Sequence, residues 1–141
     1  MSRIFFDTNL LVYLVEDYKD LSDRVIHIVT RMRERRDELV TSTLTLGELL
    51  VKPLSAGDSE LAARYEELIG SPGVSLIPFD HACARSYAEI RQDRGIRPAD
   101  AVQLACAATT GCDLFITNDE RLSRKVVRGI QFITSLKRAF L

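Results

Sequence analysis

Short apolar runs alternate with longer amphipathic stretches along the whole chain. The short runs are rich in β-branched and aromatic residues, a pattern typical of strands buried in a parallel sheet. Each run is bounded by polar residues or by a turn signal such as Gly70-Ser71-Pro72-Gly73. The pattern predicts strands at 4–6, 39–42, 74–77, 113–117 and 131–134.

The longer stretches carry apolar residues at helical spacing. They predict helices at 9–16, 21–37, 44–52, 58–69, 81–93 and 98–108. We expect Thr43 to cap the third helix and Pro53 to end it. A further helix is expected to begin after Asn118-Asp119-Glu120, and a small amphipathic tail follows the last strand.

The predicted element order is β-α-α-β-α-α-β-α-α-β-α-β, which indicates an α/β fold. Right-handed crossovers would give a three-layer arrangement, a mainly parallel five-stranded sheet with helices on both faces. The length of 141 residues suits one domain with a single substantial core. No linker, repeat or low-complexity segment interrupts residues 1–141, so we expect a single domain.

Composition narrows the functional classes. No apolar run approaches the roughly 20 residues of a membrane span, and no signal peptide is visible, so a cytoplasmic protein without membrane contact is expected. The chain has three cysteines without C-x-x-C spacing and two histidines, which makes a structural zinc site improbable. The net charge of −1 excludes electrostatic nucleic-acid binding by the chain as a whole. Such binding would require local basic patches or bound cations.

Two carboxylates follow predicted strands. Asp7, in Asp7-Thr8-Asn9, ends the first strand, and Asp119 follows the fourth. The carboxyl ends of parallel strands are where open α/β sheets bind ligands. Asp, Thr and Asn are also favoured helix caps, so capping explains either residue taken alone.

Two further carboxylates lie on predicted helices. Glu48 shares a helical face with Leu44, Gly47 and Val51. A buried Glu there requires an arginine or a metal ion as partner, and both remain open. Asp100 falls in the first turn of the helix that begins at Pro98, where the helix dipole alone would favour it. The small residues of that helix predict close packing on the sheet, with its N-terminus near the strand ends.

Capping and dipoles explain each carboxylate singly but not the set. Four carboxylates in one cleft repel each other unless a cation neutralises them. Oxygen ligands without Cys or His select Mg²⁺ or Mn²⁺. A site of this kind activates water and stabilises charge on a phosphoryl group. A bound metal would also allow an acidic cleft to hold a nucleic-acid polyanion.

Four segments of the chain resemble, in order, the four motifs of the PIN-domain ribonucleases. They are Phe5-Phe6-Asp7-Thr8-Asn9, Ser42-Thr43-Leu44-Thr45-Leu46-Gly47-Glu48-Leu49, Pro98-Ala99-Asp100-Ala101-Val102-Gln103-Leu104-Ala105 and Phe115-Ile116-Thr117-Asn118-Asp119. They span almost the whole chain. Its size and architecture are similar to those of the VapC toxins of bacterial toxin–antitoxin pairs.

The resemblance implies the strand order 3-2-1-4-5 and a Mg²⁺- or Mn²⁺-dependent endoribonuclease that cleaves single-stranded or structured RNA. It implies a homodimer and a cognate antitoxin that wraps the toxin and blocks its site. The metal-binding and catalytic residues would be Asp7, Glu48, Asp100 and Asp119. The hydrogen-bonding residues that support them would be Thr8, Asn9 and Thr117.

Other interpretations remain open at this stage. Arg97 is a candidate contact for a substrate phosphate, or a plain surface arginine. The alternatives are a non-catalytic RNA- or protein-binding module of the same fold and a housekeeping RNA-processing nuclease. An aspartyl-phosphate phosphatase requires a second Asp two residues after the first, where this chain has Asn9.

Overall fold

One parallel sheet organises the molecule. The computed structural model describes residues 1–139, and its five-stranded sheet has the order β3-β2-β1-β4-β5. All four neighbouring pairs are parallel. The strands are β1 (Arg3–Phe6), β2 (Glu38–Ser42), β3 (Val74–Ile77), β4 (Leu114–Thr117) and β5 (Phe132–Ser135). The predicted α/β class and strand order are confirmed.

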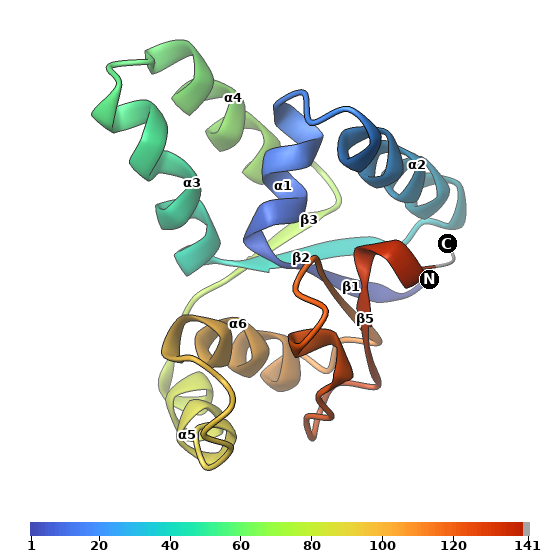
Figure 1. Ribbon diagram of the computed structural model, residues 1–141, viewed down its shortest axis with the longest axis vertical. Coiled ribbons are helices and arrows are strands. Elements are labelled where there is room, and N and C mark those ends of the chain that lie inside the picture. The colour runs from blue at the N-terminus through green and yellow to red at the C-terminus, as the bar shows by residue number, and fades with distance from the viewer. Residues whose placement is uncertain (140–141) are drawn as a thin grey trace.

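Helices cover both faces of this sheet, with α1 to α4 on one side and α5 and α6 on the other (Figure 1). They are α1 (Thr8–Val15), α2 (Asp20–Arg35), α3 (Thr43–Ser55), α4 (Ser59–Ile69), α5 (His81–Ile90) and α6 (Pro98–Thr109). None of the described helices is both long and apolar enough to cross a membrane.

The alternation of side chains along β1 divides the core in two. Ile4 and Phe6 pack in a cluster with side chains of α1, α2 and α4, while Phe5 points to the opposite face and packs with α6. The Phe5 ring stacks on Phe115 of β4 at a centroid distance of 5.0 Å. Burying each such ring stabilises the fold by about 1.5–3 kcal/mol. Because β1 is buried on both faces, the residue that follows it is held firmly.

The start and end of α3 differ from the expectation. Ser42, rather than Thr43, caps the helix, because its Oγ accepts a hydrogen bond from the backbone N–H of Thr45 at 3.2 Å. Pro53 lies inside the last turn and does not end the helix, which continues to Ser55. A proline so close to the end removes one hydrogen bond while its buried ring still packs against the core.

The segment between β4 and β5 also differs from the expectation. The predicted helix is only a 3₁₀ turn, η1 (Leu122–Arg124), and Asp119 Oδ1 accepts hydrogen bonds from the N–H groups of Arg121 and Leu122 at its start. Gly129 then turns the chain with a φ of 99°, and a Cβ there would lie 2.9 Å from the carbonyl oxygen of Ala108.

After β5 the predicted amphipathic tail forms a second 3₁₀ turn, η2 (Leu136–Arg138). The last part of that tail, residues 140–141, lies outside the described residues.

The α3–α4 hairpin is tied to the far end of α1. The Tyr65 hydroxyl of α4 donates a hydrogen bond to Glu16 Oε2, and Lys52 Nζ of α3 lies 3.4 Å from Glu16 Oε1. Burial and the Glu16 carboxylate raise the pKa of Tyr65, so this hydroxyl keeps its proton and remains a donor. Glu16 therefore joins the end of α1 to both helices of the hairpin.

Candidate functional site

The predicted site residues gather in one cleft at the carboxyl edge of the sheet. β1 and β4 are neighbours, and the backbone N–H of Asp7 donates to the carbonyl oxygen of Ile116 at 3.1 Å. The crossovers reverse direction at β1, which is the position where such sheets bind ligands. The cleft has a volume of about 400 Å³. All eight predicted residues line it: Asp7, Thr8, Asn9, Glu48, Arg97, Asp100, Thr117 and Asp119.

Asp7 is held by both carboxylate oxygens. Its Oδ1 caps α1 by accepting a hydrogen bond from the N–H of Thr8 at 2.9 Å, and its Oδ2 accepts one from the Thr117 hydroxyl at 2.8 Å. Burial raises the pKa of Asp7, and the carboxylates of Asp100 and Glu48 add to the rise, whereas the two hydrogen bonds lower it. The capping and site interpretations are thus compatible, because one side chain does both.

Glu48 occupies a different environment from the one expected. The buried face of α3 consists of Thr45, Leu49 and Pro53, so the face that carries Glu48 turns towards the cleft and Glu48 is exposed. Its Oε1 accepts hydrogen bonds from the Thr8 hydroxyl at 2.6 Å and from the Gln103 amide at 3.3 Å. The expectation of a carboxylate buried in an apolar stripe is therefore wrong, because Glu48 lines an open cleft and its neighbours Gly47 and Val51 on the same face are exposed as well.

Arg97 bridges the other two carboxylates. Its Nε lies 3.5 Å from Asp100 Oδ2, and its Nη2 donates a hydrogen bond to Asp119 Oδ2 at 3.2 Å. The Asp100 oxygen is buried and accepts no hydrogen bond in the described part of the chain. Arg97 itself is 68% exposed at its side chain. It is the one cation among the described residues that line the cleft, so it partly neutralises an acidic site.

The cleft offers the right kind of ligands for a metal ion, but not at the right spacing. Four carboxylate side chains line the cleft, and Asp100 presents a buried oxygen without a hydrogen bond within residues 1–139. This donor set suits Mg²⁺ or Mn²⁺. As the side chains stand, however, no three Asp, Glu, His or Cys residues within 1–139 lie close enough together to hold a metal. Arg97 pairs with two of the four carboxylates, so an incoming cation competes with this arginine.

The cysteines take no part in the cleft. All three are free and buried. Burial, with Cys83 nearby, raises the pKa of Cys106 to about 12. A thiol of that pKa is a poor metal ligand or nucleophile at neutral pH.

Three buried polar residues beside the cleft were not predicted as site residues: Ser42, Thr45 and Gln103. Gln103 of α6 is 2% exposed, and its amide makes hydrogen bonds with Ser42, Thr45, Thr8 and Glu48. The available signal was its position three residues after Asp100 on an otherwise apolar helix. Asn9, by contrast, lines the cleft without a side-chain hydrogen bond to any of the carboxylates within residues 1–139.

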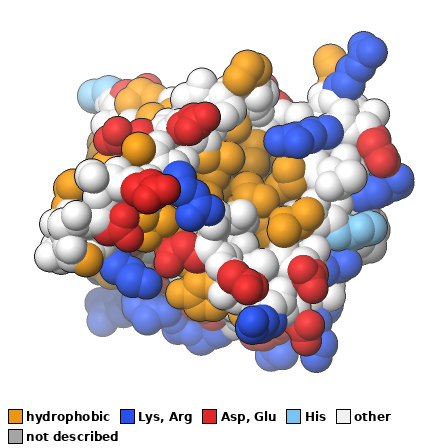
Figure 2. Space-filling view, turned by 90° about the horizontal axis from the view of Figure 1, so that it is seen from above, with side chains coloured by type: hydrophobic (Ala, Val, Ile, Leu, Met, Phe, Trp, Pro, Cys, Tyr) orange, Lys and Arg blue, Asp and Glu red, His pale blue; other side chains and the backbone are white. Residues whose placement is uncertain are grey.

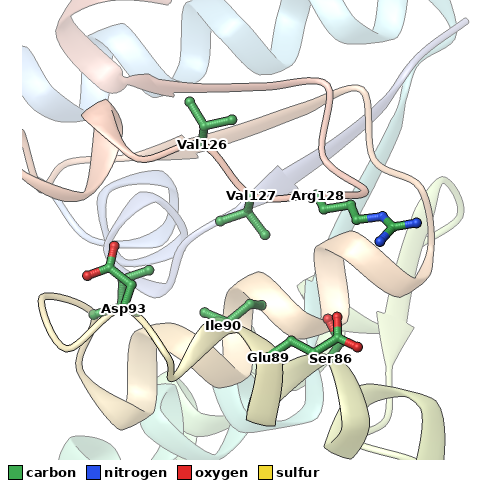
Figure 3. A pocket seen from close by; sticks show the side chains of 8 residues that line it. Ser86, Glu89, Ile90, Asp93, Val126, Val127 and Arg128 are labelled. Atoms are coloured by element: carbon green, nitrogen blue, oxygen red, sulfur yellow. The ribbon is translucent and has the colours of Figure 1, made fainter.

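Other hollows lie away from this cleft, and two of them involve α5 and the α1–α4 face. One, of about 190 Å³, lies between α5 and the segment before β5, where Ile90 faces Val127 and Glu89 and Asp93 lie at its rim (Figure 3). Another lies beside α1 and α4, where Leu14, Val15, Leu68 and Arg64 contribute to its lining. Figure 2 shows that apolar side chains are exposed in a depression on one face of the molecule, with Lys and Arg side chains beside it. Neither contains a predicted site residue.

Comparison with known proteins agrees with this geometry. The family model of the PIN domain matches residues 4–127. Similar folds occur in the crystal structure of VapBC2 from Rickettsia felis bound to a DNA fragment from their promoter, with a TM-score of 0.75, 16% identity and coverage of 94% of this chain and 98% of that chain. DNA-bound VapBC from Salmonella typhimurium gives a TM-score of 0.74, 22% identity and coverage of 96% and 99%.

A third similar structure is VapC20 from Mycobacterium tuberculosis, a toxin that cleaves the sarcin-ricin loop. It has a TM-score of 0.61 and 17% identity, with coverage of 79% of this chain and 86% of that chain. At these identities the structural matches establish a shared fold. No curated protein sequence matches the chain. The family model, however, covers most of the sequence and includes Asp7, Glu48, Asp100 and Asp119. The chain therefore belongs to the PIN domain family.

Proposed function

We propose that this protein is an endoribonuclease that requires Mg²⁺ or Mn²⁺. The observation that carries the proposal is the convergence of Asp7, Glu48, Asp100 and Asp119, from four separate segments, on one cleft that contains a single cationic side chain. A fold does not need such a concentration of negative charge, because like charges at close range destabilise it. A divalent cation removes that repulsion and allows an RNA phosphate to approach.

In this proposal the four carboxylates would hold the metal, which would polarise a phosphate oxygen and activate a water molecule. The remaining side chains orient these ligands. The Thr117 hydroxyl and the Thr8 N–H fix the two oxygens of Asp7. The Thr8 hydroxyl fixes one carboxylate oxygen of Glu48 through a hydrogen bond of 2.6 Å. Asn9 lines the same cleft as a polar contact for substrate or ligand.

Arg97 has two successive roles in this mechanism. Without metal it pairs with Asp100 and Asp119. With these carboxylates neutralised by a bound cation, the exposed Arg97 guanidinium would be free to contact a substrate phosphate. Arginine suits this exchange because its planar guanidinium binds carboxylates and phosphates with the same geometry.

We propose further that the chain is the toxin of a VapBC-type module that acts in the cytoplasm and forms a homodimer. The support is the similarity of its fold to toxins solved as toxin–antitoxin complexes and to a toxin that cleaves an RNA loop. A cognate antitoxin would cover the acidic cleft. The hollow beside α1 and α4, lined in part by Leu14, Val15 and Leu68, would offer a partner protein additional contact area.

Cleavage of a defined RNA by purified protein tests the proposal. With Mn²⁺ present we expect discrete products, and EDTA should abolish them. Asp7→Asn should reduce the cleavage rate by more than about 100-fold, because loss of even an indirect metal partner costs about 10–100-fold. Asp113→Asn, at the opposite edge of the sheet, is the matched control and should cleave normally. Protein that binds RNA but never cuts it would instead be a binding module.

A further inference from the structure

Gln103 is a buried polar residue in the wall of the acidic cleft. It lies on α6, one helical turn after Asp100, and is 2% exposed. Its side chain reaches three other elements: Ser42 at the end of β2, Thr45 and Glu48 on α3, and Thr8 on α1. Burying an amide without hydrogen bonds would cost about 1–3 kcal/mol. The surrounding polar groups satisfy it instead.

The hydrogen bonds around Gln103 have one possible direction. Glu48 accepts the Thr8 proton at 2.6 Å, because an ionised carboxylate has no proton to donate. Thr8 is then an acceptor towards Thr45 at 3.2 Å, so the Thr45 hydroxyl donates to it. Thr45 in turn accepts from Gln103 Nε2 at 2.7 Å. A directed series of donors therefore leads from Gln103 to Glu48.

The same geometry fixes the orientation of the amide. Gln103 Oε1 accepts a hydrogen bond from the Ser42 hydroxyl, and Nε2 lies 3.3 Å from Glu48 Oε1. Rotating the amide by half a turn would bring its oxygen against the Glu48 oxygen, with two acceptors facing each other. That arrangement is repulsive, so the Glu48 carboxylate and Ser42 together select a single amide orientation.

We propose that Gln103 is a positioning residue for Glu48 in metal binding. Its amide donates directly to Glu48 Oε1 and, through Thr45 and Thr8, supplies that oxygen with a second donor. One carboxylate oxygen is thereby engaged, and the other is held towards the cleft for the cation. This inference rests on the proposed metal-dependent function and adds a residue to its machinery.

Other residue types at position 103 would not serve this purpose. Leucine fills a similar volume but donates nothing, so Thr45, Thr8 and Glu48 lose their fixed order. Asparagine keeps the amide but is one methylene shorter, so it cannot span from Ser42 to Glu48. Glutamate would bring a second acceptor against the Glu48 oxygen.

The test is a double-mutant cycle read as Mn²⁺ affinity, with free Mn²⁺ measured by electron paramagnetic resonance. Gln103→Leu should weaken Mn²⁺ binding about ten-fold, the range found for partners that orient metal ligands. In a Glu48→Ala background the same substitution should change the affinity less than about two-fold, because its effect passes through Glu48. Gln103→Asn replaces the leucine variant if that one does not fold.

Cys106→Ala is the matched control, since Cys106 is also buried on α6 and makes no contact with the cleft. It should leave Mn²⁺ affinity unchanged. A ten-fold loss that persists without Glu48, or no loss at all, overturns the positioning role.

A metal-free measurement separates this proposal from the proposed function. In ¹⁵N NMR spectra of the apo protein, the side-chain amide signals of Gln103 should shift when Glu48 is replaced by Ala and should exchange slowly with solvent. Unshifted signals overturn the positioning role even if the enzyme cleaves RNA. If the signals do shift in Glu48→Ala but the wild-type protein binds no Mn²⁺, the metal-dependent function is overturned. The role of Gln103 in metal binding is then overturned with it.

Discussion

The two edges of the sheet carry similar numbers of carboxylates, but these carboxylates are paired differently with hydrogen-bond donors and cations. At the amino edge Asp113 Oδ2 accepts the backbone N–H of Arg3 at 2.8 Å, Arg3 Nη2 lies 3.3 Å from Glu38 Oε1, and Arg35 Nε lies 3.4 Å from Asp37 Oδ2. Each acidic side chain there has its own partner. At the carboxyl edge Arg97 pairs with only Asp100 and Asp119, and within residues 1–139 Asp7 and Glu48 form no salt bridge.

This difference separates stability from function within one sheet. Paired charges at the amino edge join the ends of strands that are distant in sequence. The carboxyl edge retains excess negative charge that the fold alone would not favour, as is usual where activity and stability compete. Substitutions at the amino edge should therefore lower stability, whereas those at the carboxyl edge should leave stability unchanged or raise it.

The largest expected effect concerns the amino edge. Asp113→Ala removes the acceptor for the Arg3 N–H and should lower the free energy of unfolding by about 1–2 kcal/mol. Urea denaturation measures this loss, and the Mn²⁺ affinity of the folded protein should not change. Asp113→Asn keeps an oxygen acceptor and should lose less. A large change in Mn²⁺ affinity for either variant would mean that the two edges are not independent.

Asp7→Asn is expected to raise the free energy of unfolding of the metal-free protein, by less than Asp113→Ala lowers it. Burial raises the pKa of Asp7 above its ordinary value of 3.8, so the unfolded chain loses this proton at a lower pH than the folded chain does. Stability therefore falls as the pH rises between the two pKa values, and the penalty is complete above the folded one. Asparagine has no such proton and should stabilise the metal-free protein at neutral pH by on the order of 1 kcal/mol.

Urea denaturation in EDTA, at neutral pH and again below pH 3.8, measures this effect. The gain should vanish at the lower pH, where Asp7 is protonated in both the folded and unfolded chains. An equal gain at both pH values would show that charge is not its cause.

The smallest expected effect concerns Arg97. Arg97→Gln removes a cation that competes with the metal, and because the pair is exposed, the gain in Mn²⁺ affinity should be only about three-fold. RNA cleavage should fall, since the proposed phosphate contact is lost. Isothermal titration and a cleavage assay measure these opposite changes. Arg85→Gln, remote from the cleft, should alter neither, and weaker Mn²⁺ binding by Arg97→Gln would contradict the competition.

The features predicted from the sequence are those that depend on local pattern. Apolar runs identified the strands, and motif order identified Asp7, Glu48, Asp100 and Asp119 as residues of one edge. The errors concern tertiary context. Glu48 shares a face with apolar residues, but only the packing of α3 decides that this face is open. Gln103 resembles an ordinary polar helix residue until Ser42 and Thr45 are brought against it.

The hydrogen bond between Thr8 and Glu48 has a mechanical consequence when it is considered together with Glu16. It joins the start of α1 to α3 at 2.6 Å, and Glu16 joins the end of α1 to Lys52 and Tyr65. The α3–α4 hairpin is therefore bonded to α1 at both ends of that helix. A tilt of the hairpin is resisted at two points rather than one, which keeps Glu48 in register with Asp7.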